Sequence, residues 1–169
     1  MDYSSAWLRF RKAEDEYFTS RYAFMQNETL MVNDLGVALA NAGHNDTALR
    51  FLLEIQPKVE VIIPLLSSII DLAVDSSSYY RIELARDLLH NYKSEPRVRS
   101  ITQTLVSTYL AENDEWHYLR IAELYELMNY EEEYASFLAL CQSNANPEIQ
   151  EINEDFLERK AKGLFPSSQ

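Results

Sequence analysis

The chain has 169 residues, 47% of them hydrophobic and 25% charged, with three glycines, five prolines and a formal charge of −12. This composition excludes a disordered chain, and so few glycines and prolines disfavour an all-β fold, which needs many tight turns. The negative charge repels nucleic acid and anionic membranes and attracts basic partners, although such charge can also serve solubility alone.

Three helices are expected in the first third of the chain. The first runs from about Ser5 to Met25, with large apolar residues spread around it. The second ends at Gly43, because glycine suits the left-handed position that closes a helix. Asn45 or Asp46 then caps a short helix, and Pro57 ends that helix.

The middle of the chain predicts a helix that is covered on several sides. Residues 59–74 are apolar nearly all round, which is typical of a helix in the centre of a stack. Pro64 is expected to kink this helix or to lie in its first turn. Ser76 to Ser78 offer a cap for the next helix, and Pro96 starts the one after it.

The last three helices have clear start signals. Asp114 can cap the first of them, and Asn129 with Glu132 forms a capping-box pattern for the second. Asn146 before Pro147 predicts the start of the third. The second of these helices carries an apolar stripe, Tyr134, Phe137, Leu138 and Cys141.

The spacing of these starts predicts the architecture. Helices begin near residues 78, 95, 114, 130 and 147, so a helix pair recurs about every 35 residues, as in helical solenoids. Residues 80–83 and 119–122 align one repeat apart. We therefore expect an all-α fold of about nine helices, a right-handed stack of antiparallel helix pairs. Residues 1–163 would form one domain and residues 164–169 a flexible tail.

No assembled catalytic or metal site is recognisable. Phosphate-binding glycine loops, the HExxH zinc motif and the EF-hand spacing do not occur. Two Asp-x-x-His pairs, Asp87/His90 and Asp114/His117, could ligate a metal, but both fit helix ends better. Cys141, the only cysteine, lies on an apolar stripe, where a free cysteine behaves as a small buried hydrophobe. We expect no catalytic residues, no metal and no cofactor.

Location and oligomeric state are also expectations. A single cysteine allows no intrachain disulfide and fits a reducing compartment. The first residues lack a basic region followed by an apolar stretch, and residues 59–74 are too short to span a bilayer. We therefore expect a cytoplasmic protein, monomeric until it binds a partner.

Acidic and aromatic residues recur together at helix starts. Tyrosine and tryptophan provide rigid contact area with a polar group, which suits the centre of an interface. Inter-helix packing is the alternative for any single residue. As a set they predict a partner-binding surface on one edge of the stack: Asp75, Tyr79, Tyr80, Asp114, Glu115, Trp116, Tyr130, Glu131, Glu132 and Glu133.

Residues 46–159 resemble HEAT or armadillo-like helical arrays. The tetratricopeptide pattern is approached by Trp116 and Leu119, but Arg120 and Glu123 stand where that family has glycine and tyrosine. With its acidity and size, the chain is similar to the helical immunity proteins of bacterial toxin–immunity systems, most visibly over residues 114–125.

The resemblance implies a protein that binds and neutralises a cognate toxin domain, often a basic nuclease. With the missing motifs and the charge of −12, we expect no catalysis and no contact with nucleic acid or membrane. Two alternatives remain: a generic adaptor that binds a helix or peptide of another cytosolic protein, and a helical enzyme built from scattered residues.

Overall fold

The computed structural model describes residues 3–162 and is all-helical. Helices cover 81% of these residues, and no strand occurs among them. The elements are α1 (Ser5–Met25), α2 (Glu28–Leu39), α3 (Asn45–Ile55), α4 (Val59–Ile62), η1 (Ile63–Leu65), α5 (Leu66–Val74), α6 (Tyr79–Asn91), α7 (Pro96–Leu110), α8 (Glu115–Met128), α9 (Glu131–Gln142) and α10 (Pro147–Ala161). With α4, η1 and α5 taken as one interrupted helix, residues 3–162 form the nine helices expected. The expected tail, residues 164–169, lies outside the described residues.

Several helix starts follow from the residues that precede them. The Asp114 carboxylate accepts the backbone N–H of His117 at 3.2 Å and caps α8. Asn146 accepts the N–H of Glu148 at 3.0 Å, next to a proline at the first position of α10. Pro64 lies in the short 3-10 segment η1, where it interrupts the helix between α4 and α5. These predictions are confirmed.

Three other predicted helix ends were wrong. Gly43 does not adopt the left-handed conformation. Neither Asn45 nor Asp46 caps α3, because that helix already begins at Asn45. Asn129 has φ 55° and ψ 41° and therefore closes α8 instead of capping α9. Asparagine tolerates this left-handed conformation better than most residues, so its capping preference is ambiguous from sequence.

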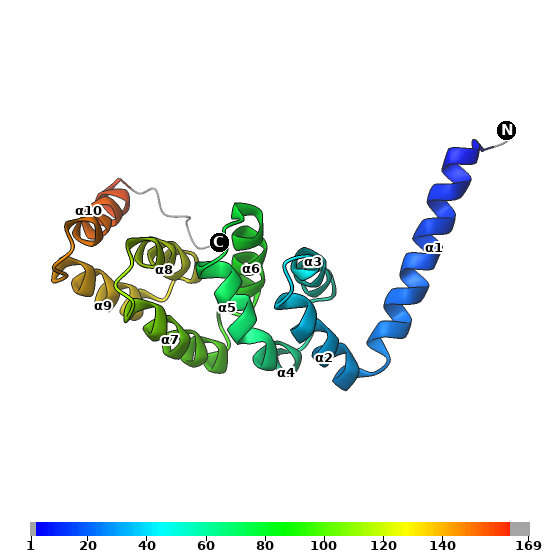
Figure 1. Ribbon diagram of the computed structural model, residues 1–169, viewed down its shortest axis with the longest axis horizontal. Helices are drawn as coiled ribbons and strands as arrows, with labels where there is room; N and C mark the ends of the chain where they lie inside the picture. The colour runs from blue at the N-terminus through cyan, green and yellow to red at the C-terminus, as the bar shows by residue number, and fades with distance from the viewer. Residues whose placement is uncertain (1–2, 163–169) are drawn as a thin grey trace.

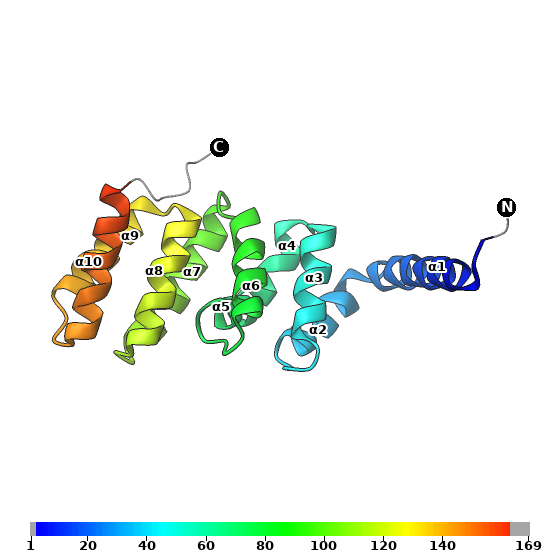
Figure 2. The same cartoon turned by 90° about the horizontal axis from the view of Figure 1, so that it is seen from above.

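The helices are arranged in two rows. Figure 1 shows α2, α4–α5, α7 and α9 along one side and α3, α6, α8 and α10 along the other. Figure 2 shows that α3, α6, α8 and α10 follow one another side by side. Helix α5 contacts α6, α7 and α8, and α9 contacts both α8 and α10. The core lies between the two rows.

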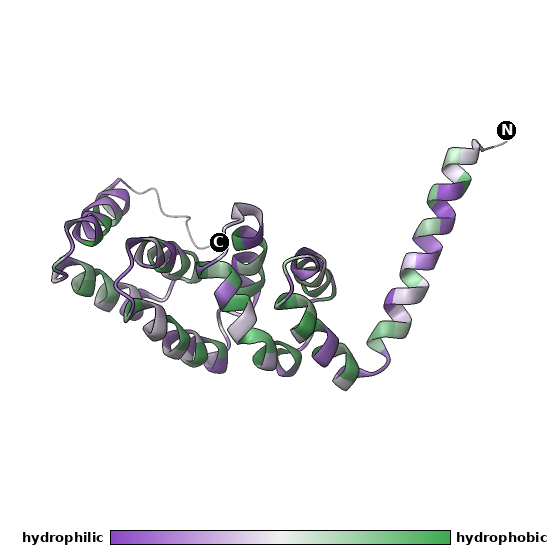
Figure 3. Ribbon diagram, viewed as in Figure 1, coloured by the Kyte–Doolittle hydropathy of each residue, from purple (hydrophilic) through white to green (hydrophobic). Residues whose placement is uncertain are grey.

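Helix α5 is the centre of that core, as its apolar sequence predicted. Leu66, Ile69 and Ile70 have no exposed surface, because neighbouring helices cover them on several sides. The α4–α5 stretch is mostly hydrophobic in Figure 3. Among the described residues, no helix combines the length and apolar character required to cross a bilayer.

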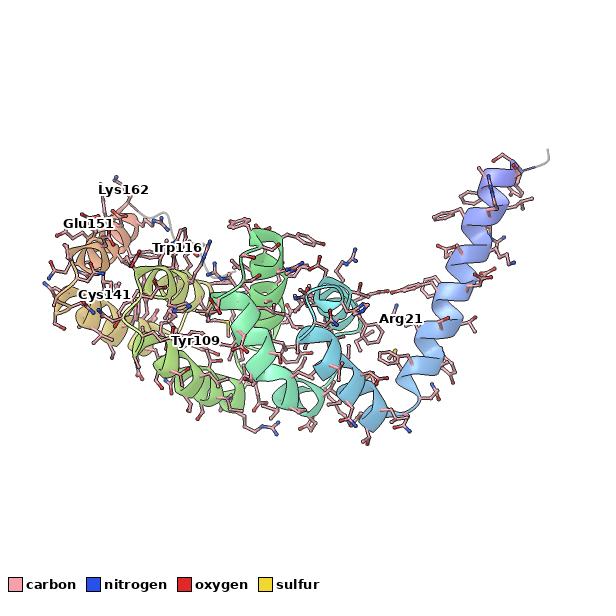
Figure 4. The ribbon with its side chains drawn as sticks, in the orientation of Figure 1. Arg21, Tyr109, Trp116, Cys141, Glu151 and Lys162 are labelled. Carbon is pink, nitrogen blue, oxygen red and sulfur yellow. The ribbon has the colours of Figure 1, made fainter. Side chains whose placement is uncertain are left out.

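Helix α1 differs from every other helix. It projects away from the two rows (Figures 1 and 2) and contains no buried residue. Its last turns are held to α3, since Tyr17 and Arg21 both hydrogen-bond to the Glu54 carboxylate, and Phe24 packs edge-on against Phe51. Figure 4 shows the Arg21 side chain reaching from α1 toward α3. The first half of α1 extends beyond this contact.

Candidate functional site

The ten residues expected to bind a partner fall in two separate places. One group lies at the starts of α6 and α8, and we call it the edge cluster: Asp75, Tyr79, Tyr80, Asp114, Glu115 and Trp116. The other lies at the start of α9, and we call it the α9 cluster: Tyr130, Glu131, Glu132 and Glu133. Because α9 begins where α8 ends, the 14 residues of α8, about 21 Å of helix, separate the two groups.

The aromatic residues of the edge cluster are exposed. Tyr79 has 63% of its surface exposed, Tyr80 48% and Trp116 59%. Figure 4 labels Trp116 on α8. Packing against other helices therefore does not account for these three side chains. Large, half-exposed aromatic residues of this kind supply the anchors of protein interfaces.

Arg120 lies between two of these aromatic rings. Its guanidinium carbon is 5.5 Å from the Trp116 ring centre and 6.0 Å from the Tyr79 ring centre, so it joins α8 to α6. Arg120 also pairs with the Glu123 carboxylate at 3.1 Å, and Glu123 accepts a second bond from Arg86 at 2.8 Å. These contacts link the two exposed rings to the ion pairs of Glu123.

Three acids surround His117: Asp75 and Asp114 of the edge cluster, and Glu112 from the loop before α8. Asp75 lies 3.2 Å from the imidazole Nε2, while Glu112 and Asp114 lie 3.3 and 3.5 Å from Nδ1. These contacts join the end of α5 to the loop before α8. Asp75 and Glu112 still have 66% and 61% of their side-chain surface exposed, so their negative charge faces solvent.

Tyr109 supports this arrangement from α7. Its ring packs edge-on against the His117 ring at 5.0 Å, and its hydroxyl donates a hydrogen bond to the Asp71 carboxylate. Burial, together with this hydrogen bond, raises the pKa of the Tyr109 hydroxyl. The edge cluster is therefore carried by α6 and α8 and supported by the end of α5 and by α7.

The α9 cluster is mostly structural. Tyr130 is only 3% exposed, and the Arg99 guanidinium covers its ring at 4.9 Å from the centre. Burial raises the pKa of Tyr130 to about 12. Glu133 accepts hydrogen bonds from Arg99 and Gln103, and the bonds from Arg99 lower its pKa. Of the four residues, Glu131 and Glu132 are the exposed ones.

A hollow of about 430 Å³ lies beside the α9 cluster, between α7 and α9. Its apolar wall includes Leu110, Phe137 and Leu140, and its acidic wall includes Glu132 and Glu133. A hollow with one apolar and one acidic wall could accept an apolar side chain that lies next to a basic one.

Within residues 3–162, no group of three histidine, cysteine or acidic side chains is placed to hold a metal ion. Asp114 acts as the cap of α8, and His90 contacts Lys93 at 2.8 Å. Cys141 has no exposed surface, and burial raises the pKa of its thiol to about 12. The thiol therefore stays protonated at neutral pH and is a poor nucleophile.

Comparison with protein-family models, with curated proteins and with solved structures finds no match for this chain.

Sequence reasoning missed two residues that organise the edge cluster. Arg120 follows Trp116 by four positions, and that spacing places two side chains side by side on a helix, so the contact was predictable. The contact of Arg120 with Tyr79 was not, because it joins two different helices. The same is true of His117, whose partner Asp75 is far away in sequence.

Proposed function

We propose that this chain is a non-enzymatic protein-binding module whose edge cluster binds a basic protein surface. The observation that carries the proposal is the pair of exposed rings, Tyr79 and Trp116, held by Arg120 and bordered by acids. An interface centre of aromatic anchors with a charged rim is the usual arrangement in protein complexes.

The architecture that supports this function is a right-handed, HEAT- or armadillo-like stack of antiparallel helix pairs. The two rows of helices and their short connections support this interpretation. In such a stack, equivalent ends of every second helix lie along one edge. The starts of α6 and α8 would then form a continuous strip available to a partner.

The partner class we propose is a cognate toxin domain, with a basic nuclease as the leading example. Residues 26–169 carry the entire net charge of −12, because the first 25 residues contain four basic and four acidic side chains. An acidic surface resembles the phosphate field that a nuclease cleft receives, and it accelerates encounter with a basic protein. The chain would act as an immunity protein.

The test is quantitative capture from the source cell at low salt. Immobilised wild-type chain should retain a basic protein, identified by mass spectrometry, and Trp116→Ala should reduce its capture about tenfold or more. Trp7→Ala is the matched control, because Trp7 is also exposed but lies on α1. If Trp116→Ala and Tyr79→Ala capture the same proteins in the same amounts as wild type, the edge cluster is not the binding site.

A second candidate function, an adaptor for a helix or peptide, is favoured by the hollow between α7 and α9. Leu140 is 42% exposed on its wall. Leu140→Asp would abolish capture of a peptide that binds in this hollow and leave capture of a protein that binds at Trp116 unchanged. Loss of capture on Trp116→Ala, with Leu140→Asp silent, supports the edge cluster.

A further inference from the structure

Helix α1 carries a row of large apolar residues that no other part of residues 3–162 covers. Trp7 is 44% exposed, Phe10 58% and Phe18 52%. The helix is 21 residues long, or about 31 Å, and only its last turns touch α3. The proposed binding of a basic partner at the edge cluster does not involve this helix, because the first half of α1 is itself basic.

The charge pattern of α1 reverses near its middle. Arg9, Arg11 and Lys12 come before Ala13, and Glu14, Asp15 and Glu16 come directly after it. If two copies of this helix lie antiparallel and centred between residues 12 and 13, the basic run of each faces the acidic run of the other. Opposite charges at facing positions favour this register and disfavour a parallel one.

The same register pairs the apolar residues. Trp7, Arg11, Glu14 and Phe18 are spaced by four, three and four positions, so they share one face of α1. In the antiparallel pair, positions whose numbers add up to 25 face each other. Trp7 then lies against Phe18 of the second copy, and Arg11 against its Glu14. Tyr3 and Tyr22 extend the same pairing at the ends.

This face is free in the single chain. Tyr17 and Phe24, two of the side chains that hold α1 to α3, lie roughly a quarter of a turn around the helix from Trp7 and Phe18, and Arg21 lies at the border of the free face. A second α1 can therefore pack against Trp7 and Phe18 without displacing Tyr17 or Phe24. Helix α1 also points away from α6 to α10, which leaves space around it (Figures 1 and 2).

We propose that the chain forms a two-fold symmetric dimer in which the α1 helices of two copies pack antiparallel, with Trp7 against Phe18 and Arg11 against Glu14. Tyr3, Trp7, Phe18 and Tyr22 are all exposed, and at about 100 Å² each these residues of the pairing face contribute on the order of 400 Å² per copy, about half of a standard stable interface. Such a dimer differs from the monomer that was expected from the sequence. It leaves the two edge clusters free and far from the dimer axis.

The test is sedimentation velocity of the full-length chain over a concentration series. Wild type should sediment as a dimer, and Arg11→Glu and Glu14→Arg should each weaken the dimer about tenfold or more. The double variant R11E/E14R should restore it, because the reversed charges again face each other. An equimolar mixture of the two single variants should form a heterodimer for the same reason. Circular dichroism of each variant checks that the helices are retained.

Trp116→Ala is the matched control for Trp7→Ala, since both tryptophans are exposed and only Trp7 lies on α1. We expect Trp7→Ala to give monomer and Trp116→Ala to leave the dimer intact. A wild-type chain that stays monomeric at every concentration would overturn the proposal, as would a dimer that survives both charge reversals. A monomer that co-sediments through Trp7 with phosphatidylserine-containing vesicles would overturn it in favour of a membrane-binding helix.

Discussion

At the scale of single residues, burial separates side chains that stabilise the fold from those available to a partner. Phe137 is 3% exposed and packs against the rings of Tyr118 and Tyr125, at 5.8 and 5.9 Å between ring centres. Leu140, one turn further along the same helix, is 42% exposed. Both residues are apolar, and their exposure differs because neighbouring side chains cover Phe137 and leave Leu140 partly open.

Replacing Phe137 with alanine should therefore lower the free energy of unfolding by about 3–5 kcal/mol, through lost burial and the cavity that remains. Leu140→Ala, the control on the same helix, should cost less than about 1 kcal/mol. Urea denaturation followed by circular dichroism measures both. Equal effects of the two substitutions would show that α9 packs through a different face.

Cys141 gives a second prediction at this scale. Because burial raises the pKa of its thiol to about 12, the thiolate is scarce at neutral pH. The native protein should resist iodoacetamide at pH 7.5 and react fully once urea unfolds it. Stoichiometric labelling of the folded chain, detected by mass spectrometry, would contradict the buried placement.

At the scale of helices, much of the fold was predictable from local signals. Pro64, Asp114 and Pro147 act as the sequence indicated, because their effects on the backbone depend on a few neighbouring residues. Asn129 was misassigned, since asparagine favours both helix starts and left-handed helix ends.

The candidate surface was only half predictable. The sequence placed Trp116 and Tyr130 on one edge, but α8 separates them, and Tyr130 is buried beneath Arg99. The acidic residues that follow Tyr130 in the sequence do not indicate this burial, because it depends on the contact between the Tyr130 ring and Arg99 of α7. The exposure of α1 was not predictable from the sequence either, because its apolar residues resemble those of a packed helix.

The pair of Arg99 and Glu133 holds α7 to α9 and predicts a pH dependence. The bonds from Arg99 lower the pKa of Glu133 in the folded state, so the pair stabilises the protein above the carboxyl's unfolded pKa of about 4.3. That stabilisation is lost as the pH falls through the lower folded pKa.

Glu133→Gln should therefore lower the stability by about 1 kcal/mol or less at pH 7, and the difference from wild type should shrink as the pH falls toward 3. Thermal unfolding at a series of pH values measures this. Glu131→Gln, an exposed residue in the same turn, should change little throughout. A Glu133 effect that is constant with pH would show that the ion pair does not contribute.

At the scale of the whole molecule, charge is divided unevenly. The first 25 residues are neutral, and the remaining residues carry the full −12. The edge cluster belongs to the acidic part and suits a basic partner, whereas α1 combines both signs and suits a copy of itself. The two surfaces can therefore work at the same time and can be disrupted separately.

The most direct test of the central proposal is surface plasmon resonance of the captured basic partner over a salt series. Electrostatic steering by the acidic edge predicts that added salt slows association more than it speeds dissociation. Charge reversal of Asp75 and Glu115 to lysine should slow association as well. Trp116→Ala should mainly speed dissociation, about tenfold or more, because an anchor residue acts after encounter. Association that is independent of salt, with all three substitutions silent, would contradict binding through the edge cluster.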